Sequence, residues 1–405
     1  MIDQPQPYDF EYTPTRVVFG RGCVSRLGEV LDGLNKERAM IVTGSNVGAN
    51  RTVMNPIESG LGERLVVTFD QTTPEKRLGT VLAGIGLLQK EEIDIVVGVG
   101  GGSSLNVARA MCSVAPLDRA PDDIRGETHE TGDVPSPGPD TLPVPNISIP
   151  TTMPGADISA GGSVSVAPRK VPDTDDDAKR VDANITDTRT MPEANFYDPA
   201  LFATTPMSVL RSSAMNGFDK GIETIYSRES TPVASAHSVR ALRHYQEGLP
   251  ELVDADPEDD AYDHAVVATQ LVQYGRKTNI IHTFGNGISF HYDIQQGTVH
   301  GIVAPHVLQY VFSNADARRT QIAAGLGIET AGLTDEEIAD RIIEDVRRVS
   351  DALELPSQLR SIEGFEREDF DLVAEEILDN YKHGRNPPGI DPSHQDIVAV
   401  LDDAW

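Results

Sequence analysis

Short apolar runs alternate with helical patterns through the first half of the chain. Residues 16–19 and 39–42 have the apolar content of strands, and apolar residues at helical spacing occupy 24–34 and 51–60. The clearest strand is 93–99, which is apolar on both faces, as a strand buried in a parallel sheet must be. This alternation predicts a parallel sheet with helices on its two faces.

The pattern changes after Asp198-Pro199, where strand-like runs become rare. Helical periodicity dominates from residue 206 to the end, most clearly in 233–245, 261–274, 335–353 and 369–381. We therefore predict an α/β domain over residues 1–202 and an all-helical domain over 203–405. Two stretches without periodicity, 116–143 and 172–182, are rich in Asp, Pro or both and are predicted to be acidic surface loops.

Charge narrows the classes of partner. The 405 residues include 34 Lys and Arg against 63 Asp and Glu, a net charge of −29, which argues against nucleic acid and anionic membranes as partners. Arginine supplies most of the positive charge. A surface rich in carboxylates and poor in lysine favours solubility in concentrated salt, so we predict a salt-adapted (halophilic) cytoplasmic protein.

Cysteine usage and hydropathy agree with this location. Cys23 and Cys112 are too far apart in α/β sequence to indicate a disulfide, and we predict two buried thiols. No apolar run reaches about 18 residues, and the first residues are polar and acidic. Neither export nor membrane spanning is indicated.

A glycine-rich turn follows the clearest strand. Gly100, Gly101, Gly102 and Ser103 lead into a helix that is predicted to begin near Leu105. Glycines there would let the backbone approach a pyrophosphate, whose charge the helix N-terminus would attract. The same residues could equally form only a tight connection between a strand and a helix.

A second strand ends in hydroxyl side chains. Thr151 and Thr152 close the apolar run 147–150, and Asp157 follows a short loop. Ligands of open α/β sheets lie at the carboxyl ends of strands, so these residues are candidates for phosphate or ribose recognition. An ordinary capped turn would produce the same pattern.

The order of several motifs resembles the iron-containing alcohol dehydrogenase superfamily over nearly the full length. The resembling segments are Arg16-Val17-Val18-Phe19-Gly20-Arg21-Gly22, Gly100-Gly101-Gly102-Ser103, Ile149-Pro150-Thr151-Thr152, Ile222-Glu223 with Ser227 and Thr231-Pro232, Val299-His300-Gly301, Asn386-Pro387 and Ala404-Trp405. The resemblance implies a dehydroquinate synthase-like architecture, with a Rossmann-like dinucleotide-binding domain followed by a helical catalytic domain. It also implies an NAD(P)-dependent alcohol dehydrogenase or carbonyl reductase, a small alcohol or carbonyl substrate, and a homodimer.

The family's metal ligands are largely replaced. In the family, an Asp and a His four residues apart on one helix hold the metal together with two further His. Asn216 stands at the first position, Lys220 at the second, and Asn286 or Gly287 at the third, so that only His300 remains. Because a protonated lysine repels a divalent cation, the resemblance predicts no metal at these positions.

One branch of the superfamily, the metal-independent maleylacetate reductases, is similar in two places. Its short Pro-Thr-Thr loop resembles Pro150-Thr151-Thr152, and its Met-Asn pair resembles Met215-Asn216. The branch keeps a histidine where this chain has Lys220, so its substrate does not transfer.

Without a metal, another group must stabilise the developing alkoxide of hydride transfer. We predict that Lys220 is the electrophile and that His291 or His300 donates or relays the proton, beside Asn216. Lys220 could equally be a surface lysine, and each histidine a structural donor.

Two departures concern the cofactor. The family commonly has an Asp after the strand 39–42, where Gly44 stands here, and loss of that charge weakly favours NADP over NAD. Asn106 and Arg109 occupy positions where the family commonly has Asp and Lys. Contact between Asn106 and the cofactor remains an expectation.

Two alternatives stay open. Asp219, Glu223, His282 and His300 could form a rearranged metal site, since Asp219 and Glu223 also lie four residues apart. Alternatively, the chain could be a non-catalytic descendant that binds a nucleotide or a partner chain.

Overall fold

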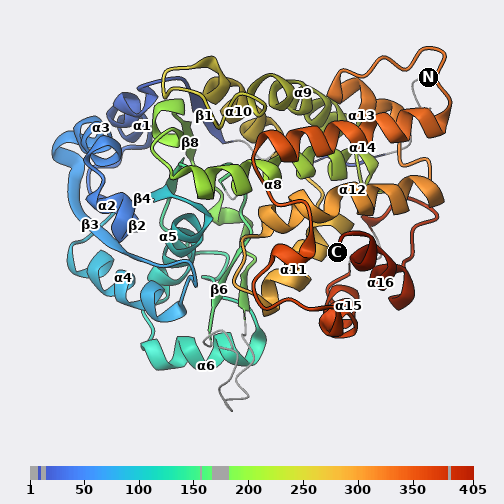
Figure 1. Ribbon diagram of the computed structural model, residues 1–405. Coiled ribbons are helices and arrows are strands. Elements are labelled where there is room, and N and C mark those ends of the chain that lie inside the picture. The colour runs from blue at the N-terminus through green and yellow to red at the C-terminus, as the bar shows by residue number, and fades with distance from the viewer. Residues whose placement is uncertain (1–7, 11–14, 156, 167–181, 382–384) are drawn as a thin grey trace. The chain divides into compact units, whose positions relative to one another are not determined.

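The computed structural model describes residues 8–10, 15–155, 157–166, 182–381 and 385–405. The chain divides into two compact units (Figure 1). One comprises Thr13–Thr205, and the other comprises Pro206–Trp405 together with the described residues 8–10. The predicted boundary after residue 202 lies three residues before this division.

The first unit is built on a parallel sheet of six strands. Their order across the sheet is β1-β8-β5-β4-β2-β3, and every neighbouring pair is parallel. The strands are β1 (Arg16–Phe19), β2 (Ala39–Gly44), β3 (Leu65–Thr72), β4 (Ile95–Gly100), β5 (Asn146–Pro150) and β8 (Ala194–Tyr197). A separate antiparallel hairpin pairs β6 (Gly162–Ser165) with β7 (Asp182–Ile185). The parallel α/β fold predicted from the alternating pattern is confirmed.

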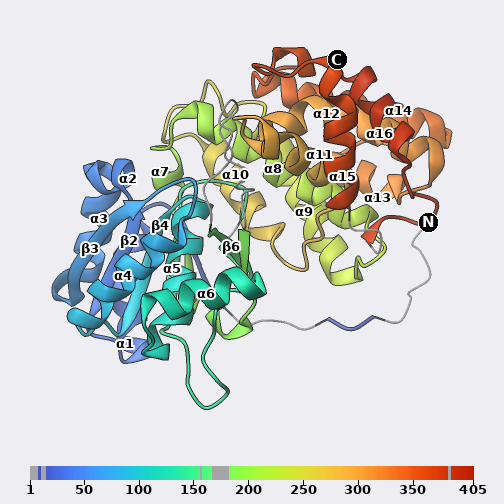
Figure 2. The same cartoon turned by 90° about the horizontal axis from the view of Figure 1, so that it is seen from below.

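Helices cover both faces of the sheet, as Figure 2 shows. They are α1 (Leu27–Leu34), α2 (Ser45–Ala49), α3 (Arg51–Leu61), α4 (Leu78–Lys90), α5 (Gly102–Val114), α6 (Pro121–Thr131) and α7 (Pro199–Phe202). Residues of α1 and α3 join one hydrophobic cluster with the sheet, and residues of α4, α5 and α6 join another. All six residues of β4 are buried between these clusters, which explains its unbroken apolar run.

Within its described residues, the second unit contains only helices. They are α8 (Met207–Tyr226), α9 (Pro232–Gly248), α10 (Asp260–Leu271), α11 (Ile280–His291), α12 (Gln296–Asn314), α13 (Arg319–Leu326), α14 (Asp335–Ala352), α15 (Phe370–Asp379) and α16 (His394–Asp403). Helix α8 lies at the centre, in contact with α9, α10, α11, α12 and α13. Sixteen of its residues are buried, so side chains on nearly all its faces must find partners inside the protein.

One predicted loop is partly wrong. Residues 116–143 include helix α6, which begins with Pro121 and has Asp122 and Asp123 in its first turn. A proline with preformed helical φ and carboxylates beside the positive helix end both favour a helix N-terminus, so the acidic composition had a structural cause. Helix α5 also starts at Gly102 rather than near Leu105. Of the second predicted loop, 172–182, only Asp182 lies within the described residues, where it begins β7.

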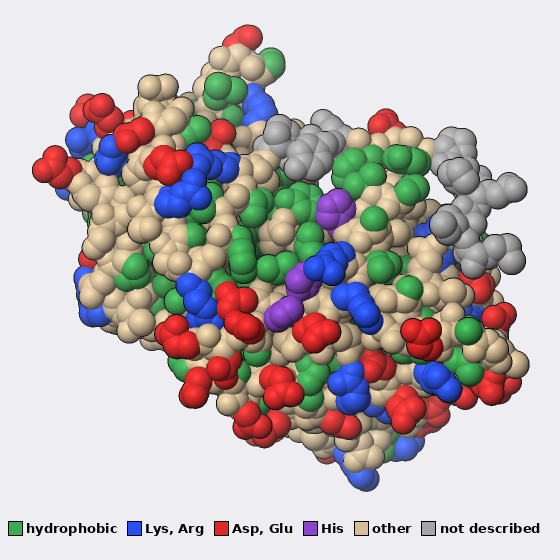
Figure 3. All heavy atoms as spheres, turned by 90° about the horizontal axis from the view of Figure 1, so that it is seen from above, with side chains coloured by type: hydrophobic (Ala, Val, Ile, Leu, Met, Phe, Trp, Pro, Cys, Tyr) green, Lys and Arg blue, Asp and Glu red, His purple; other side chains and the backbone are tan. Residues whose placement is uncertain are grey.

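The surface carries many charged side chains, and the two cysteines are buried. Figure 3 shows Asp and Glu side chains at many places over one face, with Lys and Arg among them. Cys23 and Cys112 are free and buried, as predicted, and burial raises the pKa of the Cys23 thiol to about 12. Among the described residues, no helix combines the length and apolarity needed to cross a membrane.

Candidate active site

The glycine-rich turn joins β4 to α5 in a conformation that requires glycine. Gly100 has a φ of 122°, which L side chains rarely adopt, and Gly101 precedes the first turn of α5 in an extended conformation. No described side chain caps this helix. The first N–H groups of α5 therefore face the end of the sheet, where they can bind an anion.

The neighbouring strand β5 completes this edge. The backbone N–H of Thr151 donates to the carbonyl oxygen of Gly100 over 3.1 Å, as the parallel register of β4 and β5 requires. A Cβ atom on Gly101 would lie 3.4 Å from Oγ1 of Thr152. Thr152 is therefore the partly exposed neighbour of the glycine turn, whereas Thr151 is buried and joins the turn through its backbone.

The other predicted cofactor residues around α5 are held by protein groups. Ser103 donates to the carbonyl of Pro74 over 3.4 Å. The Asn106 amide oxygen accepts from Nη1 of Arg109 over 3.2 Å, and the same nitrogen donates to Gly161 over 2.7 Å. Asn106 is thus tied to the segment that leads into β6.

Asp157 and Gly44 differ in their surroundings. Asp157 is completely buried, and its Oδ2 accepts a hydrogen bond from the hydroxyl of Tyr197 in β8. Gly44 ends β2, and a Cβ atom there would lie 3.2 Å from the carbonyl oxygen of Thr72. A side chain at position 44 would therefore require Thr72 to shift by a few tenths of an ångström.

In the helical unit, the buried residues of α8 include one amide and three ionisable side chains. Asn216, Asp219, Lys220 and Glu223 are all buried, and Lys220 is only 7% exposed. Lys220 is therefore not a surface lysine. Burying an ammonium group is costly unless charged or polar neighbours compensate it, so its surroundings matter for function.

Glu223 is held by four donors. Its Oε2 accepts from the backbone N–H of Asn279 at 2.9 Å and from Nδ1 of His282 at 2.6 Å. Its Oε1 accepts from the backbone N–H of His282 at 3.1 Å and from the Tyr226 hydroxyl at 3.3 Å. Because these backbone groups lie at the N-terminus of α11, Glu223 acts as a cap that joins α8 to α11.

A second carboxyl–imidazole pair lies beside it. Oδ2 of Asp219 is 3.3 Å from Nδ1 of His300, which lies on α12, and both side chains are completely buried. The rings of His300 and His282 are 4.4 Å apart between centroids. Three helices therefore bring together the four residues of the rearranged set, Asp219, Glu223, His282 and His300.

Burial shifts the pKa values of the acidic and imidazole groups in this cluster toward their neutral forms. Burial raises the pKa of Asp219 well above its usual range; Glu223 adds to the rise, and the Lys220 ammonium opposes it. Burial also raises the pKa of Glu223 to about 7, against the N–H donors that stabilise its charge. Burial lowers the pKa of His300 to about 4, and Lys220 adds to that effect. His300 is therefore neutral near pH 7, and the charge of Lys220 acts on both members of the second pair.

His291 lies elsewhere on α11. It is the last residue of the helix, whereas His282 is in the first turn, so the two are about 13 Å apart along the axis. Its Nε2 is 3.8 Å from the Glu376 carboxylate, and burial lowers its pKa. The structure groups His300, and not His291, with the buried residues of α8.

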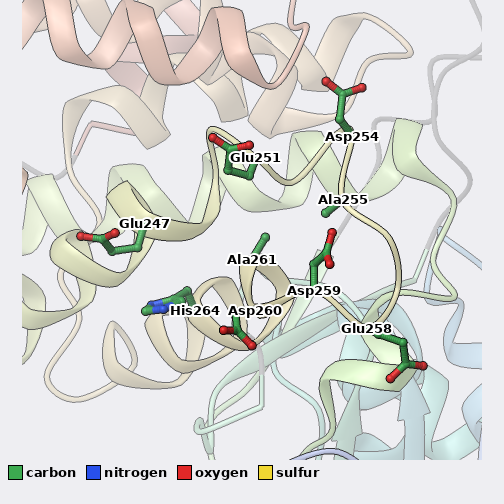
Figure 4. A pocket seen from close by; sticks show the side chains of 9 residues that line it. All are labelled: Glu247, Glu251, Asp254, Ala255, Glu258, Asp259, Asp260, Ala261 and His264. Carbon is green, nitrogen blue, oxygen red and sulfur yellow. The ribbon is translucent and has the colours of Figure 1, made fainter.

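The helical unit also has an acidic pocket, shown in Figure 4. It is lined by Glu247, Glu251, Asp254, Ala255, Glu258, Asp259, Asp260, Ala261 and His264. These residues come from the end of α9, the start of α10 and the connection between them. None of them belongs to the buried cluster of α8, α11 and α12.

Family models match both units. The model for iron-containing alcohol dehydrogenases matches residues 14–199, and the model for the C-terminal part of the Fe-containing alcohol dehydrogenase family matches residues 211–405. The chain belongs to the iron-containing alcohol dehydrogenase family. It is an alcohol dehydrogenase or reductase of that family, as the order of motifs predicted.

Individual relatives agree over the full length. The NAD-dependent methanol dehydrogenase of Bacillus methanolicus is 26% identical over 401 residues, covering 97% of this chain and 99% of that protein. A crystal structure of a 1,3-propanediol oxidoreductase superposes with a TM-score of 0.85 at 21% identity, covering 99% of this chain and 100% of the other. The maleylacetate reductase of Agrobacterium tumefaciens superposes with a TM-score of 0.77 at 20% identity, over 99% and 98% of the two chains. These structural likenesses establish the fold and do not single out the maleylacetate reductase branch.

The residues that the resemblance assigns to the family's metal positions are poor metal ligands. Lys220 presents an ammonium group, Asn286 is exposed and accepts from Gln296, and Gly287 has no side chain. In the rearranged set, both oxygens of Glu223 are already taken by protein donors. Among the described residues, no group of three or more His, Cys, Asp or Glu is arranged to hold a metal ion.

The sequence suggested Asp219, Glu223, His282 and His300 only as an alternative metal site, and it gave no indication of Gly285. A Cβ atom on Gly285 of α11 would lie 2.2 Å from Nε2 of His300. An isolated glycine in a helical pattern carries no signal of such a contact, because the neighbour comes from another helix. The fixed partners of Asn106 and Asp157 were hidden for the same reason.

Proposed function

We propose that this family member transfers hydride between a nicotinamide cofactor and a small alcohol or carbonyl compound without the family's metal. The observation that supports this most strongly is the buried Lys220, which stands at a metal-ligand position of the family. Its ammonium group would supply the positive charge that the metal supplies in other family members. The relative that uses methanol suggests small alcohols and aldehydes as first substrates to test.

The cofactor would be held by the carboxyl edge of the sheet. The N-terminus of α5 at Gly101 and Gly102 would bind the pyrophosphate, because its N–H groups carry no side-chain cap. Thr152 adjoins this turn and would offer its hydroxyl to phosphate or ribose, and Thr151, which is buried, would support the turn through its backbone. When bound, the nicotinamide supplies or accepts the hydride at the carbonyl carbon. Ser103, Asn106 and Asp157 would shape the edge through their contacts within the protein.

Lys220 would act on the substrate oxygen. As hydride reaches a carbonyl carbon, negative charge grows on the oxygen, and a preorganised donor in a site that excludes water stabilises that charge. The Lys220 ammonium can donate a hydrogen bond to this oxygen, and Asn216 one turn earlier can orient the same group. His300 would pass the proton that the product oxygen needs, and His291 is the alternative donor.

Substitution of Lys220 tests this assignment. We expect Lys220→Ala to lower kcat by about 100-fold or more while NADPH affinity stays unchanged, as when an oxyanion donor is removed. Lys277→Ala is the control, because Lys277 is partly exposed and pairs with Glu229 at 3.1 Å. Turnover unchanged by Lys220→Ala, measured on a panel of short alcohols and aldehydes, would exclude the proposed electrophile.

Three further features belong to this proposal. Gly44 in place of the family's common aspartate supports NADP over NAD, because no carboxylate at that position repels a 2′-phosphate. The net charge of −29 supports a cytoplasm of high salt. Family analogy supports a homodimer. Parallel titrations with NADPH and NADH test the cofactor preference. Light scattering in high salt tests the homodimer.

A further inference from the structure

The ring of His300 is enclosed by side chains and backbone from two other helices. Asp219 of α8 faces its Nδ1 atom at 3.3 Å. The His282 ring of α11 lies against it, with the two ring planes at 57°. Gly285, one turn further along α11, faces its Nε2 atom. The position of this imidazole therefore depends on residues far from it in the sequence.

Gly285 is required by space rather than by backbone conformation. A Cβ atom there would lie 2.2 Å from Nε2 and 2.5 Å from Cδ2 of His300, well inside van der Waals contact. The φ of Gly285 is not positive, so any residue could adopt its backbone conformation. Because His300 is completely buried, its ring cannot turn away into solvent. Even an alanine at position 285 must therefore displace the imidazole or separate α11 from α12.

Asp219 is the partner on the other side of the ring. Within the described residues, neither oxygen of Asp219 and neither ring nitrogen of His300 has a hydrogen-bond partner. Buried polar groups of folded proteins nearly always have one, and the 3.3 Å approach places Oδ2 of Asp219 beside Nδ1 of His300 as a candidate partner.

We propose that Asp219 and Gly285 are positioning residues for His300, Asp219 by holding Nδ1 and Gly285 by leaving room for the Nε2 edge of the ring. A carboxyl beside one ring nitrogen fixes which nitrogen carries the proton, and hence what the other can do. The catalytic consequence rests on the proposed function, in which His300 passes a proton. The placement of the His300 ring is independent of the proposed function.

Histidine ring NMR tests the placement directly. In the full-length protein with labelled histidine, His300→Gln identifies the His300 resonances by their loss. We expect Gly285→Ala and Asp219→Leu each to move these resonances, and Asp219→Asn to restore them in part because an amide can still bond Nδ1. Gly325→Ala is the control: it is a buried helix glycine whose Cβ would lie 2.9 Å from Leu242, and we expect it to leave the His300 resonances in place.

Activity separates this inference from the proposed function. We expect Gly285→Ala and Asp219→Leu to lower kcat/KM by about tenfold or more, equivalent to about 1.4 kcal/mol. If His300 resonances stay in place in both variants, the positioning role is overturned, whatever the activity. If they move while His300→Gln retains full turnover, the positioning role stands and the proton role of His300 is wrong.

Discussion

Oε2 of Glu223 on α8 lies 2.6 Å from Nδ1 of His282 on α11, and the same carboxylate caps the N-terminus of α11. We predict that Glu223→Ala lowers the free energy of unfolding by about 3–5 kcal/mol, because it leaves buried donors without an acceptor. Glu223→Gln should cost less, since one oxygen remains. Denaturant unfolding measures both, with the exposed Glu247→Ala as control at about 0.5 kcal/mol or below. A Glu223→Ala protein as stable as the parent would show that the cap is unimportant.

The glycine turn between β4 and α5 is the predicted site of cofactor binding. We expect Gly101→Val to weaken NADPH binding at least about tenfold, because branches on its Cβ would press against Thr152 and obstruct the approach to α5. Fluorescence titration of NADPH measures the change. Gly86→Ala is the control: it lies in α4 with open space around its Cβ, so it should bind NADPH normally and gain up to about 1 kcal/mol of stability. Equal affinity in the two variants would argue against a phosphate site at this turn.

The burial of His300 predicts a pH dependence of stability. Its pKa falls from 6.5 to about 4 in the folded protein, so the unfolded state binds the proton more readily. The resulting stability is present above pH 6.5 and is lost as the pH falls through 4. The full effect is about 3 kcal/mol. We expect His300→Gln to reduce the difference in the free energy of unfolding between pH 7 and pH 4.5. If the free energy of unfolding changes equally with pH in the parent and the variant, His300 has an ordinary pKa.

The excess of carboxylates predicts stabilisation by salt. With a net charge of −29, we expect the Tm to rise between 0.1 M and 2 M KCl, because salt shortens the range of repulsion from about 10 Å to below 3 Å. Thermal unfolding in a neutral osmolyte of equal osmolality is the control for exclusion effects. A Tm that is independent of KCl would remove the argument for salt adaptation.

The sequence predicted the fold well because its signals are local. Alternating apolar runs marked β1, β2, β4 and β5, and helical periodicity marked the long helices of the second unit. Helix α6 was missed because its acidic, proline-initiated sequence resembles a loop when read by composition alone. The hairpin of β6 and β7 was missed because its pairing partners are separated by a long segment.

The candidate site was predictable where residue identity carried the signal. Lys220 and Asn216 were noticed because they depart from the family's pattern, and their burial agrees with a place in the site. The approach of Gly285 to His300 and the pairing of Asp157 with Tyr197 depend on the packing of separate elements. No local spacing encodes such contacts, so they required the structure.

We propose that the chain transfers hydride without the family's metal. The most direct test is to quantify Fe, Zn and Ni by mass spectrometry in protein purified in high salt, and to measure carbonyl reduction with NADPH and with NADH on the same sample before and after chelation. We predict turnover with far less than one metal per chain and no loss on chelation. One tightly bound metal per chain, with activity that disappears and returns with it, would contradict the proposal.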